Sequence, residues 1–155
     1  MDERALDFWL GEWDCRWHDG HGVNSVTREL DDAVVMERFE ALGDEPFRGM
    51  SLSVYDESAG WRQTWVDANG SYWHLEGSSL DDGSVVFATP GPVDADRAFK
   101  RMVFSGIDRD AFDWRWESSP DAERWHERWA IRYTRRTEGR PPLTSAGSSP
   151  TSPPG

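Results

Sequence analysis

The sequence has one cysteine, no long hydrophobic run and few basic residues relative to acidic ones, and each of these features argues against a class of protein. With Cys15 alone, the chain cannot form an internal disulfide, which is typical of proteins in a reducing compartment. No run approaches the roughly 18 apolar residues that a membrane-spanning helix needs. The acidic start Met1-Asp2-Glu3, with no apolar run behind it, differs from a secretory signal, so we expect a cytoplasmic protein.

Positive charge is scarce as well. The 17 basic and 29 acidic residues give a formal net charge of −12. Nucleic-acid binding depends on a basic face, so we expect no nucleic-acid partner, and an anionic membrane surface is excluded on the same ground. The length fits one domain, and the sequence does not set its oligomeric state. We expect a folded domain over residues 1–137 and a disordered tail over 138–155, which is rich in Pro, Ser and Gly and lacks apolar periodicity.

Tryptophan, by contrast, is abundant. The chain has ten in 155 residues, and eight of them form pairs at even spacing. The pairs are Trp13 and Trp17, Trp61 and Trp65, Trp114 and Trp116, and Trp125 and Trp129. Alternate residues of a strand face the same side, so the two members of each pair project together. Four such pairs on separate strands converge if the sheet closes into a barrel, which predicts an aromatic interior.

Turn signals recur along the chain at nine places, and nine turns imply ten strands. They lie at residues 19–22, 31–32, 43–46, 56–60, 69–70, 81–83, 90–92, 108–110 and 119–121. Asn69-Gly70 favours a type I′ hairpin turn. The pattern predicts an all-β fold, a ten-stranded antiparallel up-and-down barrel.

Two segments are less regular. At the front, Leu6, Trp9 and Leu10 have helical spacing and Gly11 follows as a C-cap, so we expect a short N-terminal helix. Residues 121–129 fit either a helix or a strand, because Trp125 and Trp129 also lie four apart on a helix. The β-forming residues 130–134 that follow favour the strand.

The segment from Asp7 to Trp13, DFWLGEW, resembles the opening of lipocalin-like (calycin) barrels, whose first strand carries Gly-x-Trp after a short helix. The segments SLSVYD (51–56) and WRQTWVD (61–67) resemble a bacterial family of uncharacterised lipocalin-like proteins. Ten strands would place the chain nearer to fatty-acid-binding proteins and haem-binding nitrobindins than to secreted lipocalins. The resemblance implies a central cavity for a small apolar ligand, with Arg132 or Arg135 packed over Trp13 to close one barrel end.

The expected ligand is a small hydrophobic, aromatic molecule. Gln63 and Glu127 each lie between the members of a tryptophan pair, so both are expected to point inward and orient this ligand. Arg101 is a further candidate, either for a ligand carboxylate or for neutralising Glu127. The register of its strand stays open, because Met102 and Phe104 are apolar on the opposite face. The candidate binding residues are Trp13, Trp17, Trp61, Gln63, Trp65, Trp73, Arg101, Trp114, Trp116, Trp125 and Trp129.

No metal site is expected, because His18 and His21 flank a turn and no third ligand accompanies them. His74 is expected to point outward or to lie at the rim. We expect no cofactor. Haem with His126 as its axial ligand is the less favoured alternative, because His126 faces the side of its strand opposite to Trp125 and Trp129. Cys15 shares the inward face of Trp13 and is expected to be a small buried hydrophobe.

Two other functions stay open. One is an isomerase or cyclase on the same barrel, with Glu127 as the catalytic acid or base in a desolvated site. The other is a protein-interaction module with a filled barrel, in which exposed Trp9 and Phe47 would contact a partner. The sequence carries no catalytic motif that decides between an enzyme and a binding protein.

Overall fold

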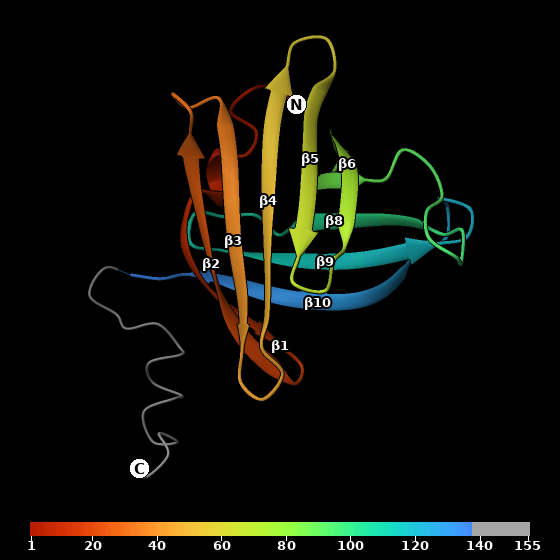
Figure 1. The fold of residues 1–155 in the computed structure, drawn as a ribbon. Coiled ribbons are helices and arrows are strands. Elements are labelled where there is room, and N and C mark those ends of the chain that lie inside the picture. Colours follow the sequence, from red (N-terminus) through yellow and green to blue (C-terminus); the bar gives the residue numbers. More distant parts are fainter. Residues whose placement is uncertain (138–155) are drawn as a thin grey trace.

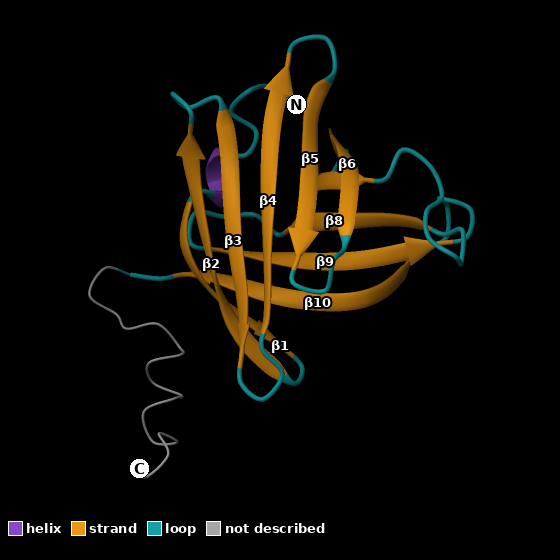
Figure 2. Cartoon of the chain, viewed as in Figure 1, coloured by secondary structure: helices purple, strands orange, loops and turns teal. Residues whose placement is uncertain are grey.

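The computed structural model describes residues 1–137 as ten antiparallel strands that close into a barrel (Figures 1 and 2). Each strand pairs with its neighbours in the chain, and β1 pairs with β10 to close the sheet, so the all-β up-and-down prediction is confirmed. The strands are β1 (Gly11–Trp17), β2 (Gly20–Glu29), β3 (Val34–Leu42), β4 (Phe47–Asp56), β5 (Gly60–Asp67), β6 (Tyr72–Ser79), β7 (Val85–Ala88), β8 (Phe99–Ser105), β9 (Ala111–Ser119) and β10 (His126–Arg135). The expected tail lies outside the described residues.

The barrel is flattened. In Figure 1, β2 to β5 run upright across the front, and β8 to β10 cross behind them nearly at right angles. This crossing is typical of two curved halves of one sheet that pack with their strands orthogonal. The core side chains lie between the two halves, and they include Trp13, Trp61, Phe87, Phe104 and Phe112.

The expected N-terminal helix is only a 3-10 turn, η1 (Asp7–Trp9). Leu10 already has an extended backbone, and Gly11 begins β1 at a φ of 124° instead of capping a helix. Leu6 and Trp9 are buried, so the segment acts as a plug whose apolar side chains enter the barrel. Burial of two large side chains outweighs the helical spacing of a segment too short to form a stable helix by itself.

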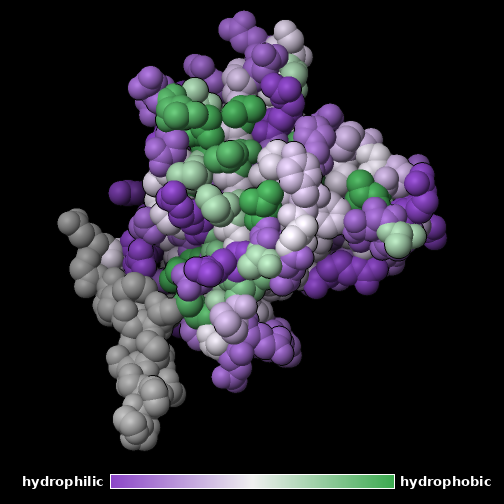
Figure 3. All heavy atoms as spheres, in the orientation of Figure 1, coloured by the Kyte–Doolittle hydropathy of each residue, from purple (hydrophilic) through white to green (hydrophobic). Residues whose placement is uncertain are grey.

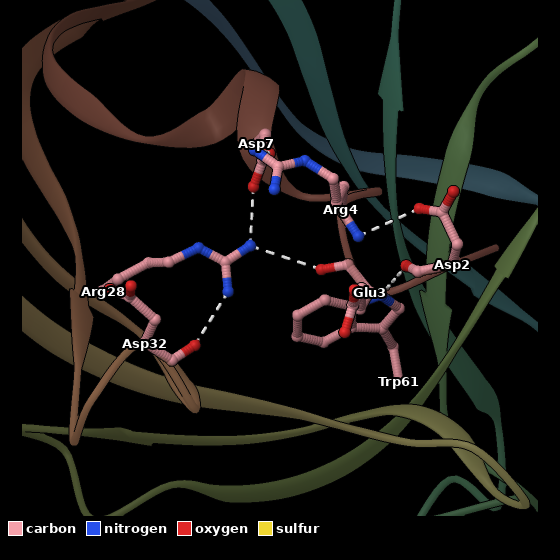
Figure 4. Close-up of polar contacts among 7 residues, drawn as sticks. All are labelled: Asp2, Glu3, Arg4, Asp7, Arg28, Asp32 and Trp61. Atoms are coloured by element: carbon pink, nitrogen blue, oxygen red, sulfur yellow. Dashed lines mark hydrogen bonds and ion pairs between the residues drawn. The ribbon is translucent and has the colours of Figure 1, made fainter.

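Polar contacts hold this plug against the strand ends (Figure 4). Arg28, near the end of β2, donates to Asp7 Oδ1 at 2.6 Å and to the Glu3 carbonyl at 3.3 Å. The indole N–H of Trp61, at the start of β5, donates to the Asp2 carbonyl at 2.8 Å. The N-terminal segment therefore closes the barrel end that carries the β2–β3 and β4–β5 turns.

An arginine of the last strand lies over the first tryptophan of β1. The guanidinium carbon of Arg135 is 4.2 Å from the centre of a Trp13 ring, which is cation–π geometry. Arg135 also donates to the carbonyls of Leu10 at 2.7 Å and Phe8 at 3.2 Å. Of the two arginines named from the sequence, Arg135 holds this position, whereas Arg132 pairs with Asp113 on the outer face.

The hairpin between β5 and β6 differs in detail from expectation. Gly70 has a φ of 81°, but Asn69 is not among the residues with positive φ, so the turn is not type I′. The Gly70 N–H donates to the Asp67 carbonyl, and the Asp67 carboxylate accepts the N–H groups of Asn69 and Ser71. An aspartate that caps the loop through its side chain fixes this turn instead of two residues in the left-handed region.

The outer face of β4 and β5 is partly apolar. Met50, Leu52 and Val66 are each at least 40% exposed, and Figure 3 shows apolar side chains gathered on the face that β3 to β5 present to the viewer. Within residues 1–137, no helix is long and apolar enough to cross a membrane.

Candidate functional site

A cavity of about 290 Å³ lies inside the barrel, at the end opposite to the N-terminal plug. Its wall includes Phe47 at the start of β4, Asp67 at the end of β5, and Asn69 and Ser71 in the loop that follows. These residues mark the barrel end with the β3–β4 and β5–β6 turns. The barrel is therefore plugged at one end and hollow at the other.

Aromatic rings form most of the cavity wall. The rings come from β3, β4, β5, β6, β9 and β10, and they belong to Phe39, Phe47, Trp65, Trp73, Trp114, Trp116 and Trp129. Several of them contact one another edge to face: the ring centres of Trp73 and Trp116 are 5.7 Å apart, and those of Trp114 and Trp129 are 5.6 Å apart. Edge-to-face contacts between fixed rings give a rigid wall with apolar faces for a ligand to pack against.

Trp65 is held in place by a glycine on the next strand. A Cβ atom at Gly49 would overlap the Trp65 indole, so the ring lies where the side chain of residue 49 would otherwise project. The Trp65 Nε1–H donates to Asp67 Oδ2 at 2.9 Å, and the ring packs against Phe47 at 6.4 Å. The absent side chain of Gly49 thus creates the space in which Trp65 forms part of the cavity wall.

A polar cluster lies at the inner surface of the cavity, around Glu37 of β3. Glu37 Oε1 accepts from the Ser51 hydroxyl at 2.7 Å, and Oε2 accepts from Asn24 Nδ2 at 2.7 Å. Asn24 Nδ2 also lies 3.0 Å from the hydroxyl oxygen of Tyr133. Glu37 and Tyr133 line the cavity, so this cluster is the polar surface that a ligand would meet.

Burial shapes the acid–base behaviour of the cluster. Desolvation raises the pKa of Glu37 above its ordinary value of 4.5, and the hydrogen bonds from Ser51 and Asn24 oppose this shift. Desolvation also raises the pKa of Tyr133 and of Cys15 well above their ordinary values, so both keep their protons at neutral pH. Cys15 is fully buried, as expected from its inward position on β1.

Five of the tryptophans named from the sequence line the cavity, namely Trp65, Trp73, Trp114, Trp116 and Trp129. Trp13 and Trp61 are buried in the core near the N-terminal plug. Trp17 lies behind the wall, 5.2 Å edge to face from Trp129. Gln63 is buried beside Ser53, to which its amide donates at 2.9 Å, and it does not line the cavity.

Arg101 and Trp125 lie on the outer face of the barrel, away from the cavity that the sequence interpretation gave them. Arg101 pairs with Glu117 at 2.7 Å, and its guanidinium carbon lies 4.0 Å from the centre of a Trp125 ring. In the register, Arg101 is opposite Glu117 and Met102 is opposite Trp116, so Met102 takes the inward position. The sequence left the inward face of residues 99–105 open. The structure places Met102 inward, and Arg101 faces outward beside Glu117 and Trp125.

Glu127 is exposed on the outer face, contrary to the expectation that it shares the inward face of Trp129. The cause is a β-bulge. Glu127 pairs with Glu117 and Trp129 pairs with Trp116, so Arg128 is an extra residue between them. An extra residue reverses the alternation of side chains, which lets Trp129 face inward while Glu127 faces outward.

The histidines do not approach the cavity. His126 is exposed and does not line it, and His74 is exposed on β6 with Nε2 at 3.7 Å from Glu76, so its outward position is confirmed. Within residues 1–137, no three His, Cys, Asp or Glu side chains gather closely enough to hold a metal ion.

Glu37 is the functional candidate that the sequence interpretation missed. It stands between Val35 and Phe39, both of which are buried, and in a regular strand these three residues share a face. The same reasoning that selected Glu127 between two tryptophans applies here, on a strand without a bulge. Alternation on β10 also predicts that Tyr133 faces inward, because it lies two residues after the apolar Ile131, and both line the cavity.

In comparisons with known proteins, the chain matches no protein-family model and no curated protein sequence.

Proposed function

We propose that this protein binds a small hydrophobic, aromatic molecule in the barrel cavity. The supporting observation is the cavity itself, about 290 Å³ in volume and walled by five indoles. Pockets for small molecules are concave and mostly apolar, with a few fixed polar groups, and here Glu37 and Tyr133 are those groups. A lipocalin-like relationship is part of the proposal, and Arg135 stacked on Trp13 is the geometry that supports it.

The other two functions have less support from the geometry. Glu127, the acid or base of the isomerase or cyclase alternative, is exposed and remote from the cavity lining. In the interaction-module alternative, Trp9 and Phe47 would be exposed and the barrel filled. Instead, Trp9 is 1% exposed, Phe47 lines the cavity, and the barrel is hollow at one end.

A fluorescence titration with N-phenyl-1-naphthylamine, an uncharged aromatic probe, tests the proposal. The probe should bind the wild-type protein with saturation. Replacing Ile131 with Trp should weaken binding by about tenfold or more, because the added ring fills cavity space. The matched control is Leu52→Trp, which adds the same ring on the exposed outer face. Circular dichroism establishes that both variants fold, and equal binding by both would overturn the proposal.

A further inference from the structure

The charges of the cavity wall are all of one sign. Glu37 and Asp67 line the cavity, and no Lys, Arg or His does so among the described residues. Arginines are common in this chain, yet those nearest the cavity in the register, such as Arg38 and Arg101, lie on outward positions of their strands. A carboxylate ligand would therefore enter a cavity that offers it two negative groups and no cationic partner.

The carboxylate of Glu37 can accept further hydrogen bonds. Ser51 and Asn24 each donate one hydrogen bond to Glu37, which leaves further lone pairs on both carboxylate oxygens. Glu37 lines the cavity, so these lone pairs face the space that a donor group of a ligand would enter.

Glu37 also lacks a compensating positive charge. Its two donors are neutral, and no Lys, Arg or His within residues 1–137 forms an ion pair with it. A buried carboxylate is costly unless it is paired, so the site favours a ligand that brings the missing cation.

The aromatic wall suits the same kind of ligand. Indole faces attract cations more strongly than other aromatic side chains do, and Trp65 and Trp129 belong to the wall that contains Glu37. The net charge of −12 adds a long-range attraction for positive ligands.

We propose that the cavity selects an organic cation, a flat aromatic body that carries an ammonium group, with the ammonium on Glu37 and the rings between the indoles. This inference rests on the proposed function and names the ligand class of the same site. It distinguishes this barrel from one that holds a fatty-acid anion, for which an inward-facing cationic side chain would be needed.

Isothermal titration calorimetry with three naphthalene probes of similar shape tests the proposal. The probes are 2-(2-naphthyl)ethylammonium, 2-(2-naphthyl)ethanol and 3-(2-naphthyl)propanoate. The wild-type protein should bind the ammonium at least about tenfold more tightly than the alcohol, because hydrogen bonds to charged groups are the stronger ones. The propanoate should bind most weakly of the three. This comparison uses the wild-type chain alone, so it does not depend on how a variant folds.

A pair of variants then assigns the selectivity to Glu37. Glu37→Gln should remove most of the preference for the ammonium and leave the affinity for the alcohol within about twofold, because shape is kept and charge is lost. Glu40→Gln is the matched control, since Glu40 lies on the same strand, is exposed and removes the same charge. The control should keep the wild-type preference.

The outcomes separate the two proposals. Equal binding of the ammonium and the alcohol would overturn the cation inference while the proposed function stands. Absence of binding by all three probes would overturn both. An equal loss of preference in Glu37→Gln and Glu40→Gln would show that overall charge, and not the cavity carboxylate, selects the ligand, which also overturns the inference.

Discussion

At the scale of single residues, the molecule places two carboxylates of similar sequence context in opposite environments. Glu37 and Glu127 each stand between hydrophobic neighbours of the same parity. Glu37 is buried at the inner surface of the cavity, whereas Glu127 is exposed. Side-chain alternation, had it been applied to Glu37, would have placed it correctly on its regular strand. The same alternation fails for Glu127, because a bulge leaves little local signal in the residue types.

The buried position of Glu37 makes stability depend on pH. Its pKa is raised in the folded state, so the folded protein binds more protons than the unfolded chain as pH rises from about 4.5 through the raised pKa. The free energy of unfolding of the wild type should therefore fall across that window, by up to about 1.4 kcal/mol per pH unit, relative to Glu37→Gln. Urea unfolding of both proteins at a series of pH values measures the difference. A difference that does not change with pH would contradict the burial account.

Arg135 and Arg132 form a second instructive pair on the last strand. Arg135→Met should lower the free energy of unfolding by about 2 kcal/mol, because Trp13 loses its cation–π partner and the Leu10 and Phe8 carbonyls lose a charged donor. Arg132→Met is the control. Arg132 and its partner Asp113 are each 52% exposed, so this change should cost less than about 1 kcal/mol. Equal losses in chemical denaturation would show that Arg135 does not secure the barrel end.

At the scale of elements, β10 combines two registers in one strand. Glu127 follows one register with β9, and Trp129 to Thr134 follow another that is shifted by one residue. Arg128 absorbs the shift, and its Nε donates to the Ser118 hydroxyl at 2.7 Å. The bulge is what allows a polar, exposed start of the strand to continue into an aromatic wall.

Deleting Arg128 should therefore be tolerated. Without this residue, Glu127 and Trp129 become neighbours, and regular alternation already places the first outward and the second inward. We expect a cooperative unfolding transition and retained probe binding, with a loss of about 1 kcal/mol for the hydrogen bond to Ser118. Deleting Ala130, which lies in the regular part of the ladder, should abolish cooperative unfolding. The bulge assignment fails if the two deletions behave alike in circular dichroism and calorimetry.

Gly49 on β4 leaves the space that the Trp65 ring of β5 occupies in the cavity wall. Gly49→Ala should displace the Trp65 indole and weaken binding of the naphthyl probes by about tenfold, since the added Cβ overlaps the ring. Gly91→Ala is the control, because nothing lies within 4 Å of a Cβ at that position. Calorimetric titration of both variants checks the effect, and unchanged binding by Gly49→Ala would show that Trp65 is not part of the ligand contact.

At the scale of the whole molecule, the strand count, the up-and-down order and the aromatic interior could all be predicted from turn spacing and paired tryptophans. An aromatic cavity was predicted, but its polar residues Glu37 and Tyr133 were not. Arg101 was misplaced because residues 99–105 carry apolar side chains on both faces and so give no period. Trp125 was misplaced because the bulge at Arg128 separates it from Trp129 and reverses the alternation between them. The prediction of an N-terminal helix was wrong, because burial of Leu6 and Trp9 in the barrel outweighed the helical spacing of the apolar residues.

The two ends of the barrel differ in how they are closed. The N-terminal plug, Arg28 and Arg135 close one end, while the cavity occupies the other. The cavity end is therefore free of the plug contacts that close the opposite end. Variants of cavity residues should consequently change binding more than they change the cooperativity of unfolding.

The most direct measurement is a crystal structure of the protein with 2-(2-naphthyl)ethylammonium. We expect the naphthalene rings to lie between Trp65, Trp73 and Trp116, with the ammonium nitrogen within hydrogen-bonding distance of a Glu37 carboxylate oxygen. A probe found on the outer face beside Met50 and Leu52, with the cavity free of it, would contradict the claim that this barrel is a ligand-binding protein.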